Sequence, residues 1–138
     1  MQEVSFFVPG VPVPQGSKNA GVRGGRAYMW EANKKHKPWR DKVTAEATKH
    51  LGVFGKDTPV EVHAIFVFDR PKSVAVKKRP RMSVKPDLDK LMRSICDSIS
   101  KAGVWGDDAR MVKLVAQKLY PNETILALGA HITIREAK

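Results

Sequence analysis

A long amphipathic stretch in the second half of the chain needs a hydrophobic layer to cover one of its faces. Apolar side chains recur at helical spacing from residue 88 to residue 102, between Pro86 and Gly103. Asp87 stands where a helix cap would sit. The pattern therefore predicts a helix over residues 88–102 with one face in the core and a charged face opposite.

The rest of the chain shows the periodicity of four strands and a second helix. The residues of 60–68 are β-branched or aromatic at many positions and nearly all apolar, which indicates a central strand covered on both faces. Residues 31–51 predict a helix with Pro38 in the first turn of its main part. The other strands are predicted over residues 4–8, 111–119 and 124–134, the last two joined as a hairpin by a turn at 120–123. The order β-α-β-α-β-β indicates a single α+β domain over residues 1–138, a mixed sheet with helices packed on it.

The chain is strongly basic, with 25 Lys and Arg against 14 Asp and Glu and a net charge of +11. This favours a partner with dense negative charge, nucleic acid ahead of an anionic membrane. The sequence has no run of about 18 apolar residues and no signal-peptide pattern at its start, so we expect a cytoplasmic protein without a membrane partner. Cys96 is the single cysteine, and its helical apolar setting predicts a reduced, packed thiol.

Two basic segments, about 9–29 and 70–85, contain prolines and glycines and are predicted to be loops. Flexible chain dense in Lys and Arg suits contacts to phosphate, although a solvated loop is the alternative for each segment. The candidate DNA-binding residues are Lys18, Arg23, Arg26, Lys77, Lys78, Arg79, Arg81 and Lys85.

Negative charge is concentrated in residues 85–110, which hold five of the fourteen acidic residues. Asp87 and Asp89 flank the start of the predicted helix, and Asp107 and Asp108 follow a turn with two glycines. Grouped carboxylates repel one another unless a cation holds them, and hard divalent cations prefer oxygen ligands. The alternatives are a helix cap at Asp87 and solvated turn residues at 107 and 108.

The length of the predicted helix limits how these carboxylates can meet. A helix over residues 88–102 is roughly 20 Å long, and six extended residues cover at most about the same distance. Asp108 can therefore reach the start of the helix only if the connection runs nearly straight back. Otherwise the helix must be shorter, or the cluster must form across a dimer.

The run P-D-L-D-K-L at 86–91, followed by Asp97 and by A-G-V-W-G-D-D-A at 102–109, closely resembles the signature of the RusA family of Holliday junction resolvases. The N-terminal P-G-V-P-V-P-Q-G-S-K, the later G-R-A-Y and W-R are similar to the opening of bacteriophage and prophage members. The resemblance implies a homodimeric α+β endonuclease in the bacterial host cell. It also implies that the enzyme nicks opposing strands of a four-way DNA junction with Mg²⁺, for which Mn²⁺ can substitute.

By position, the resemblance implies that Asp87, Asp89 and Asp108 are the catalytic, metal-binding aspartates, with Asp107 as the neighbouring acid. Arg93 stands where the family has a functional lysine, and Lys90 where the family commonly has asparagine. An arginine keeps its charge, so its expected role is to stabilise the phosphate electrostatically, and Lys90 is expected to share it.

Three other functions remain open at this point. A less selective branched-DNA nuclease would use the same residues. A non-catalytic DNA-binding module would explain the basic charge but not the grouped acids, and a sugar-nucleotide enzyme with a metal-binding D-x-D would explain the acids but not the charge. The histidines at 36, 50, 63 and 131 lack metal-ligand spacing and are expected to be structural or exposed.

Overall fold

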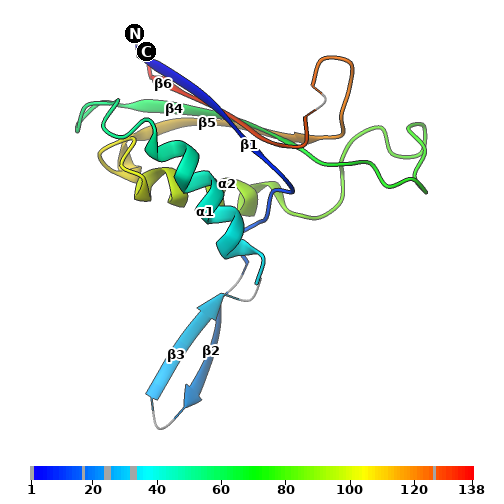
Figure 1. Cartoon of the computed structure of the whole chain (residues 1–138), viewed down its shortest axis with the longest axis horizontal. Coiled ribbons are helices and arrows are strands. Elements are labelled where there is room, and N and C mark those ends of the chain that lie inside the picture. Colours follow the sequence, from blue (N-terminus) through cyan, green and yellow to red (C-terminus); the bar gives the residue numbers. More distant parts are fainter. Residues whose placement is uncertain (1, 17, 24–25, 32–33, 126) are drawn as a thin grey trace.

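Two helices cover one face of a four-stranded mixed sheet (Figure 1). This computed structural model describes residues 2–16, 18–23, 26–31, 34–125 and 127–138, and for residues 18–31 it describes the backbone. The elements of the main body are β1 (Glu3–Pro9), α1 (His36–Thr48), β4 (Val60–Val67), α2 (Leu88–Lys101), β5 (Met111–Leu119) and β6 (Gly129–Glu136). The strand order is β1-β6-β4-β5, in which β6 is antiparallel to both neighbours and β4 is parallel to β5. The α+β architecture with a mixed sheet is as predicted.

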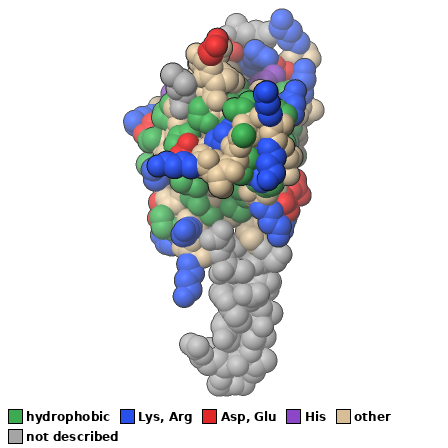
Figure 2. All heavy atoms as spheres, turned by 90° about the vertical axis from the view of Figure 1, so that its right-hand side faces the viewer, with side chains coloured by type: hydrophobic (Ala, Val, Ile, Leu, Met, Phe, Trp, Pro, Cys, Tyr) green, Lys and Arg blue, Asp and Glu red, His purple; other side chains and the backbone are tan. Residues whose placement is uncertain are grey.

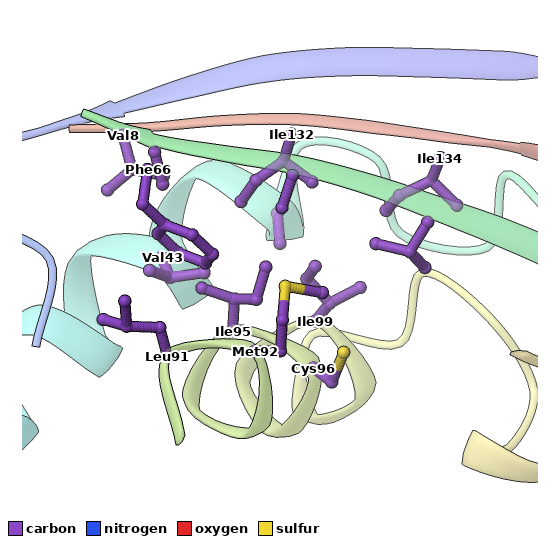
Figure 3. Packing of buried hydrophobic residues seen from close by; sticks show 14 of the residues in the cluster. Val8, Val43, Phe66, Leu91, Met92, Ile95, Cys96, Ile99, Ile132 and Ile134 are labelled. Atoms are coloured by element: carbon purple, nitrogen blue, oxygen red, sulfur yellow. The ribbon is translucent and has the colours of Figure 1, made fainter. Parts of the chain in front are cut away.

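The predicted helix over residues 88–102 is confirmed as α2, whose apolar face is fully buried at Leu91, Ile95 and Ile99. Figure 3 shows these side chains pointing toward the sheet, where they meet residues such as Phe66 and Ile132. Helix α1 packs beside α2, and a hydrogen bond of 3.0 Å joins the buried side chains of His36 on α1 and Ser94 on α2. The apolar face of α2 thus determines how the layer of helices packs on the sheet.

The predicted hairpin of the last two strands is wrong. β4 lies between β5 and β6, so the chain from residue 120 to residue 128 passes over the end of β4. Helix α2 serves as the crossover of a parallel β4-α2-β5 unit, which a short turn could not provide. β6 begins at Gly129, later than the predicted residue 124, at a φ of +143° where a Cβ would collide with the carbonyl oxygen of Val8.

Strand β4 is central, as predicted, but helices cover only one of its faces. Its side chains alternate between buried and half-buried positions, and Glu61 and His63 lie on the open face. There Arg135 of β6 hydrogen-bonds to both of them. The hydrogen bond from Arg135 holds the pKa of Glu61 below its ordinary value. On this face of the strand, polar side chains pair with one another, and neither α1 nor α2 packs against them.

The N-terminal half departs from the predictions at two places. The predicted loop over residues 9–29 contains a two-stranded antiparallel sheet, β2 (Lys18–Arg23) paired with β3 (Arg26–Glu31), which stands away from the main body (Figure 1). Helix α1 begins at His36, five residues later than predicted, with Pro38 in its first turn as expected. Backbone pairing between β2 and β3 therefore replaces much of the predicted loop, and β3 includes Glu31, the first residue of the predicted helix.

The four histidines, expected to be structural or exposed, each contact another side chain of the fold. His50 stacks on Phe6 at a ring-centroid distance of 5.5 Å, and His131 lies against Phe7 at 4.5 Å. Within the ranges that the structure describes, no helix has the length and apolar character to span a membrane.

Candidate active site

Asp87 marks the start of α2 without acting as a side-chain cap. Its backbone has extended angles (φ −70°, ψ 134°), and its carbonyl oxygen accepts from the amide of Leu91 at 3.1 Å. Among the described residues its carboxylate receives no capping hydrogen bond, and the side chain is half exposed. It forms an ion pair with Lys90, whose Nζ lies 3.8 Å from Oδ2. The carboxylate therefore remains available to a ligand.

Asp89 and Asp108 line one groove between α2 and β5. The groove has a volume of about 680 Å³ and a largely apolar floor, to which Met92 and Met111 contribute. Both aspartates are exposed. Arg93 and Asp97 lie along the same groove, one and two turns beyond Asp89 on α2. A cation and several carboxylates are thus gathered on one side of the helix.

The turn that carries Asp108 is held in place by several contacts. The indole Nε1 of buried Trp105 donates to Asp108 Oδ1 at 3.3 Å, which orients the carboxylate. Arg110 donates to the carbonyl oxygen of Lys56 and to the carboxylate of Asp57, both at 3.1 Å. A Cβ on Gly106 would collide with that same Lys56 carbonyl, so the close approach of the two segments requires glycine there.

Asp107 has a different role from its neighbour. Its carboxylate accepts from the amide of Ala109 at 3.2 Å and caps the short 3₁₀ helix Asp108–Arg110. This is the local turn chemistry that the sequence offers as the alternative to metal binding.

Asp108 lies beside the middle of α2, where it lines the groove together with Cys96 and Asp97. Burial raises the pKa of the Cys96 thiol to about 12, and the negative charges of Asp108 and Asp97 add to the effect. Asp87 precedes the helix and does not line this groove.

Asp87 and Lys90 line a second cavity, on the other side of the first turn of α2. Within the described ranges no three His, Cys, Asp or Glu side chains stand close enough to hold a metal ion together. One chain thus brings Asp89, Asp108 and Arg93 together but leaves Asp87 and Lys90 apart from them.

The predicted DNA-binding residues fall on two projecting segments. Lys18, Arg23 and Arg26 lie on the paired strands β2 and β3, where Arg23 and Arg26 are partners in the backbone register. Lys77, Lys78, Arg81 and Lys85 are exposed on the loop between β4 and α2. Arg79 differs, because its guanidinium donates to the hydroxyl of Tyr120 at 3.1 Å and its carbonyl accepts from Arg70 at 2.6 Å.

The sequence did not indicate Lys118, which fixes the approach to α2. Its ammonium donates to the carbonyl oxygens of Val84 and Pro86, at 2.5 and 2.7 Å. Both carbonyls belong to the segment that leads into Asp87. A lysine within an apolar strand gives no signal of this role, because its partners are backbone atoms 32 and 34 residues away.

Comparison with known proteins relates nearly the whole chain to one family. The family model described as endodeoxyribonuclease RusA matches residues 9–135. A protein of Bacillus subtilis (strain 168), the uncharacterized protein YqaN, is 27% identical over 132 residues, which cover 89% of this chain and 92% of YqaN. The matched region includes both cavities and all four aspartates.

Proposed function

Since this chain belongs to the RusA family of endodeoxyribonucleases, we propose that it is a Mg²⁺-dependent nuclease that resolves four-way DNA junctions by paired symmetrical nicks. The observation that carries the proposal is the grouping of Asp89, Asp108 and Arg93 around one groove in a chain of net charge +11. Carboxylates beside a fixed cation suit hydrolysis of a phosphodiester. A groove lined by these charges is unsuited to a neutral substrate. We place this activity in the cytoplasm of a bacterial host, for a phage- or prophage-encoded protein.

The donor set fits a hard divalent cation. Asp89 and Asp108 are exposed carboxylates, and Asp108 is oriented by Trp105 without losing its second oxygen. Asp87, freed from capping, is the third ligand, and Asp107 supports the turn as a cap. When bound there, Mg²⁺, or Mn²⁺ in its place, would lower the pKa of a water molecule and stabilise charge on the phosphate.

The positions of Arg93 and Lys90 suggest that the two residues bind different phosphates. Arg93 shares the groove of Asp89 and Asp108, so its permanent charge can hold a phosphate oxygen beside the cut bond. Lys90 faces the other cavity with Asp87, where its ammonium can hold a neighbouring phosphate. In this arrangement Arg93 takes the position nearer the reacting phosphate.

A second copy of the chain would bring Asp87 together with Asp89 and Asp108. Asp87 lines a different cavity from Asp89 and Asp108, and among the described residues no three such side chains of one chain stand close enough to hold an ion. Beside the groove, the edge strand β5 leaves Val112, Leu114 and Val115 exposed at 62%, 47% and 44%. An apolar edge strand is suited to pairing with another chain, and a twofold axis there would bring two grooves together. We therefore propose a homodimer through this side of the molecule, with two sites for two nicks.

The basic loop between β4 and α2 should supply phosphate contacts. Replacing Lys77 and Lys78 together by Ala should weaken junction binding and flatten the plot of log affinity against log salt by about two units, because each lost phosphate contact removes about 0.9 from the slope. Arg79 is left intact, since its loss would also break the contact to Tyr120. Binding is measured by fluorescence anisotropy over a range of salt concentrations.

The matched control replaces Lys37 of α1 and Lys49 directly after it, which already pair with Asp41 and Glu46. This variant should keep the wild-type slope. An unchanged slope in the Lys77 and Lys78 variant would remove the loop from the DNA interface.

Selectivity among DNA substrates distinguishes a junction resolvase from a less selective branched-DNA nuclease. The protein should nick a four-way junction at two symmetrical positions much faster than a flap or a linear duplex. Equal rates on all three substrates would indicate a less selective branched-DNA nuclease, and binding without nicking would indicate a non-catalytic module.

A further inference from the structure

One end of the sheet holds a cavity whose position sets it apart from the groove of Asp89. Strands β1, β4 and β5 run in the same direction, and their last residues Pro9, Val67 and Leu119 are level in the sheet register. Their carboxyl ends therefore open at one edge, which is where open α/β sheets bind their ligands. A cavity of about 720 Å³ lies there, between the segments that leave the three strands and the first turn of α2.

The interior of this cavity is apolar, and its charged lining holds three lysines and two aspartates. Its walls come from the buried side chains of Pro12, Val13, Phe68 and Met82, and exposed Val11 lies at its rim. The charged side chains that line it are Lys35, Lys85, Lys90, Asp69 and Asp87. Figure 2 looks onto this end of the molecule and shows hydrophobic side chains gathered among Lys and Arg.

Hydrogen bonds hold the walls in place. Lys118 fixes the carbonyls of Val84 and Pro86 on one side, and on another the amide of Gln15 donates to the carbonyl of Lys90 at 3.0 Å. At the third side Arg70 lies 4.1 Å from the ring centroid of Tyr120. The cavity is therefore built by contacts among three separate segments.

We propose that this cavity holds one unstacked nucleobase of the junction, from a nucleotide next to the phosphate that is cut. The inference rests on the proposed DNA-nuclease function and names the part of the substrate that this region recognises. A nucleobase is the apolar portion of DNA, and the phosphates on either side of it would meet Lys85 and Lys90 at the rim. The carboxylate of Asp69 can accept hydrogen bonds from base amino groups.

The position of Asp87 links this cavity to the reaction. Asp87 lines the cavity and begins the same helix turn that carries Asp89 to the groove. A base held in the cavity would thus fix the register of the strand relative to the acidic residues. Bases at a branch point are the least costly to unstack, so this requirement favours a junction over a continuous duplex.

The test uses 2-aminopurine, an adenine analogue whose fluorescence rises when it is unstacked. After the cuts are mapped, the analogue is placed beside the cut phosphate of a junction, and the protein is added without divalent metal so that the strand stays intact. Fluorescence should rise on binding when the analogue is beside the cut, and should not rise when it lies within an arm.

The variant Val11→Asp places a negative charge at the rim, at a side chain that is 70% exposed. It should lose the fluorescence rise and cut about tenfold more slowly, as expected for the loss of one base contact. Leu51→Asp is the matched control, at a side chain 67% exposed beyond the end of α1, and should behave as the wild type. On a junction that lacks the base beside the cut, the Val11→Asp variant and the wild type should cut at the same rate.

A wild-type protein that nicks the junction with Mg²⁺ but gives no fluorescence rise would overturn the cavity assignment and leave the nuclease function intact. Persistence of the rise in Val11→Asp would overturn it as well. A protein that neither binds nor nicks junctions would instead contradict the proposed function itself.

Discussion

Replacing Asp89 or Asp108 by Asn should reduce junction cleavage by at least about 10³-fold while binding is retained or becomes tighter. The amide keeps the shape of the side chain but removes the charge that a metal ion requires. Removing negative charge from a DNA-binding surface does not weaken its attraction for phosphate. The measurement is single-turnover cleavage of a labelled junction, with binding measured in parallel without divalent metal.

The control for these variants is Asp97→Asn. Asp97 lines the same groove on α2 and carries the same charge, but lies two turns beyond Asp89 and outside the proposed ligand set. Its variant should cleave within about threefold of the wild-type rate, as for a surface charge that contacts neither metal nor phosphate. Wild-type cleavage by either Asp89→Asn or Asp108→Asn would show that the groove is not the active site.

A dimer built from one Asp87→Asn chain and one Asp108→Asn chain should recover cleavage. If each site takes Asp87 from one chain and Asp108 from the other, this mixed dimer has one site with both aspartates intact and one with neither. It should then nick one strand of the junction at about half the wild-type total rate, although both parent homodimers are inactive. The mixed dimer is purified by two different affinity tags, and nicks are mapped on each strand.

The outcome distinguishes two geometries. A site completed within one chain would leave each half of the mixed dimer with one missing carboxylate and no activity. Full inactivity would thus contradict completion across the dimer, while the assignment of the two aspartates would stand. A mixed dimer of Asp108→Asn with wild type, which has one intact site in either geometry, controls for purification.

The helix α2 and its core face could be predicted from sequence because the pattern is local. Apolar residues at intervals of three and four admit one buried face, and Gly103 supplies the end of the helix. The pairing of β5 and β6 could not be predicted in the same way. A turn-like sequence at 120–123 is equally compatible with a hairpin and with a passage over a neighbouring strand, and only the parallel partnership of β4 and β5 decides between them.

The same distinction applies to the candidate site. The acidic residues could be singled out because their charge is unusual in a basic chain. Their contacts could not, because these depend on residues far apart in sequence, as when Lys118 fixes the segment before Asp87. The division of Asp87 and Asp89 between two cavities is also invisible in the sequence, since it follows from where β5 and the segment after β4 pack against α2.

The most direct measurement is strand mapping on a synthetic four-way junction, with purified protein in Mg²⁺ and in chelator. The expected result is a pair of symmetrical nicks on opposing strands in Mg²⁺, none in chelator, and recovery when Mn²⁺ is added. Nicking that persists in chelator, or binding without any nick in Mg²⁺, would contradict a metal-dependent junction nuclease.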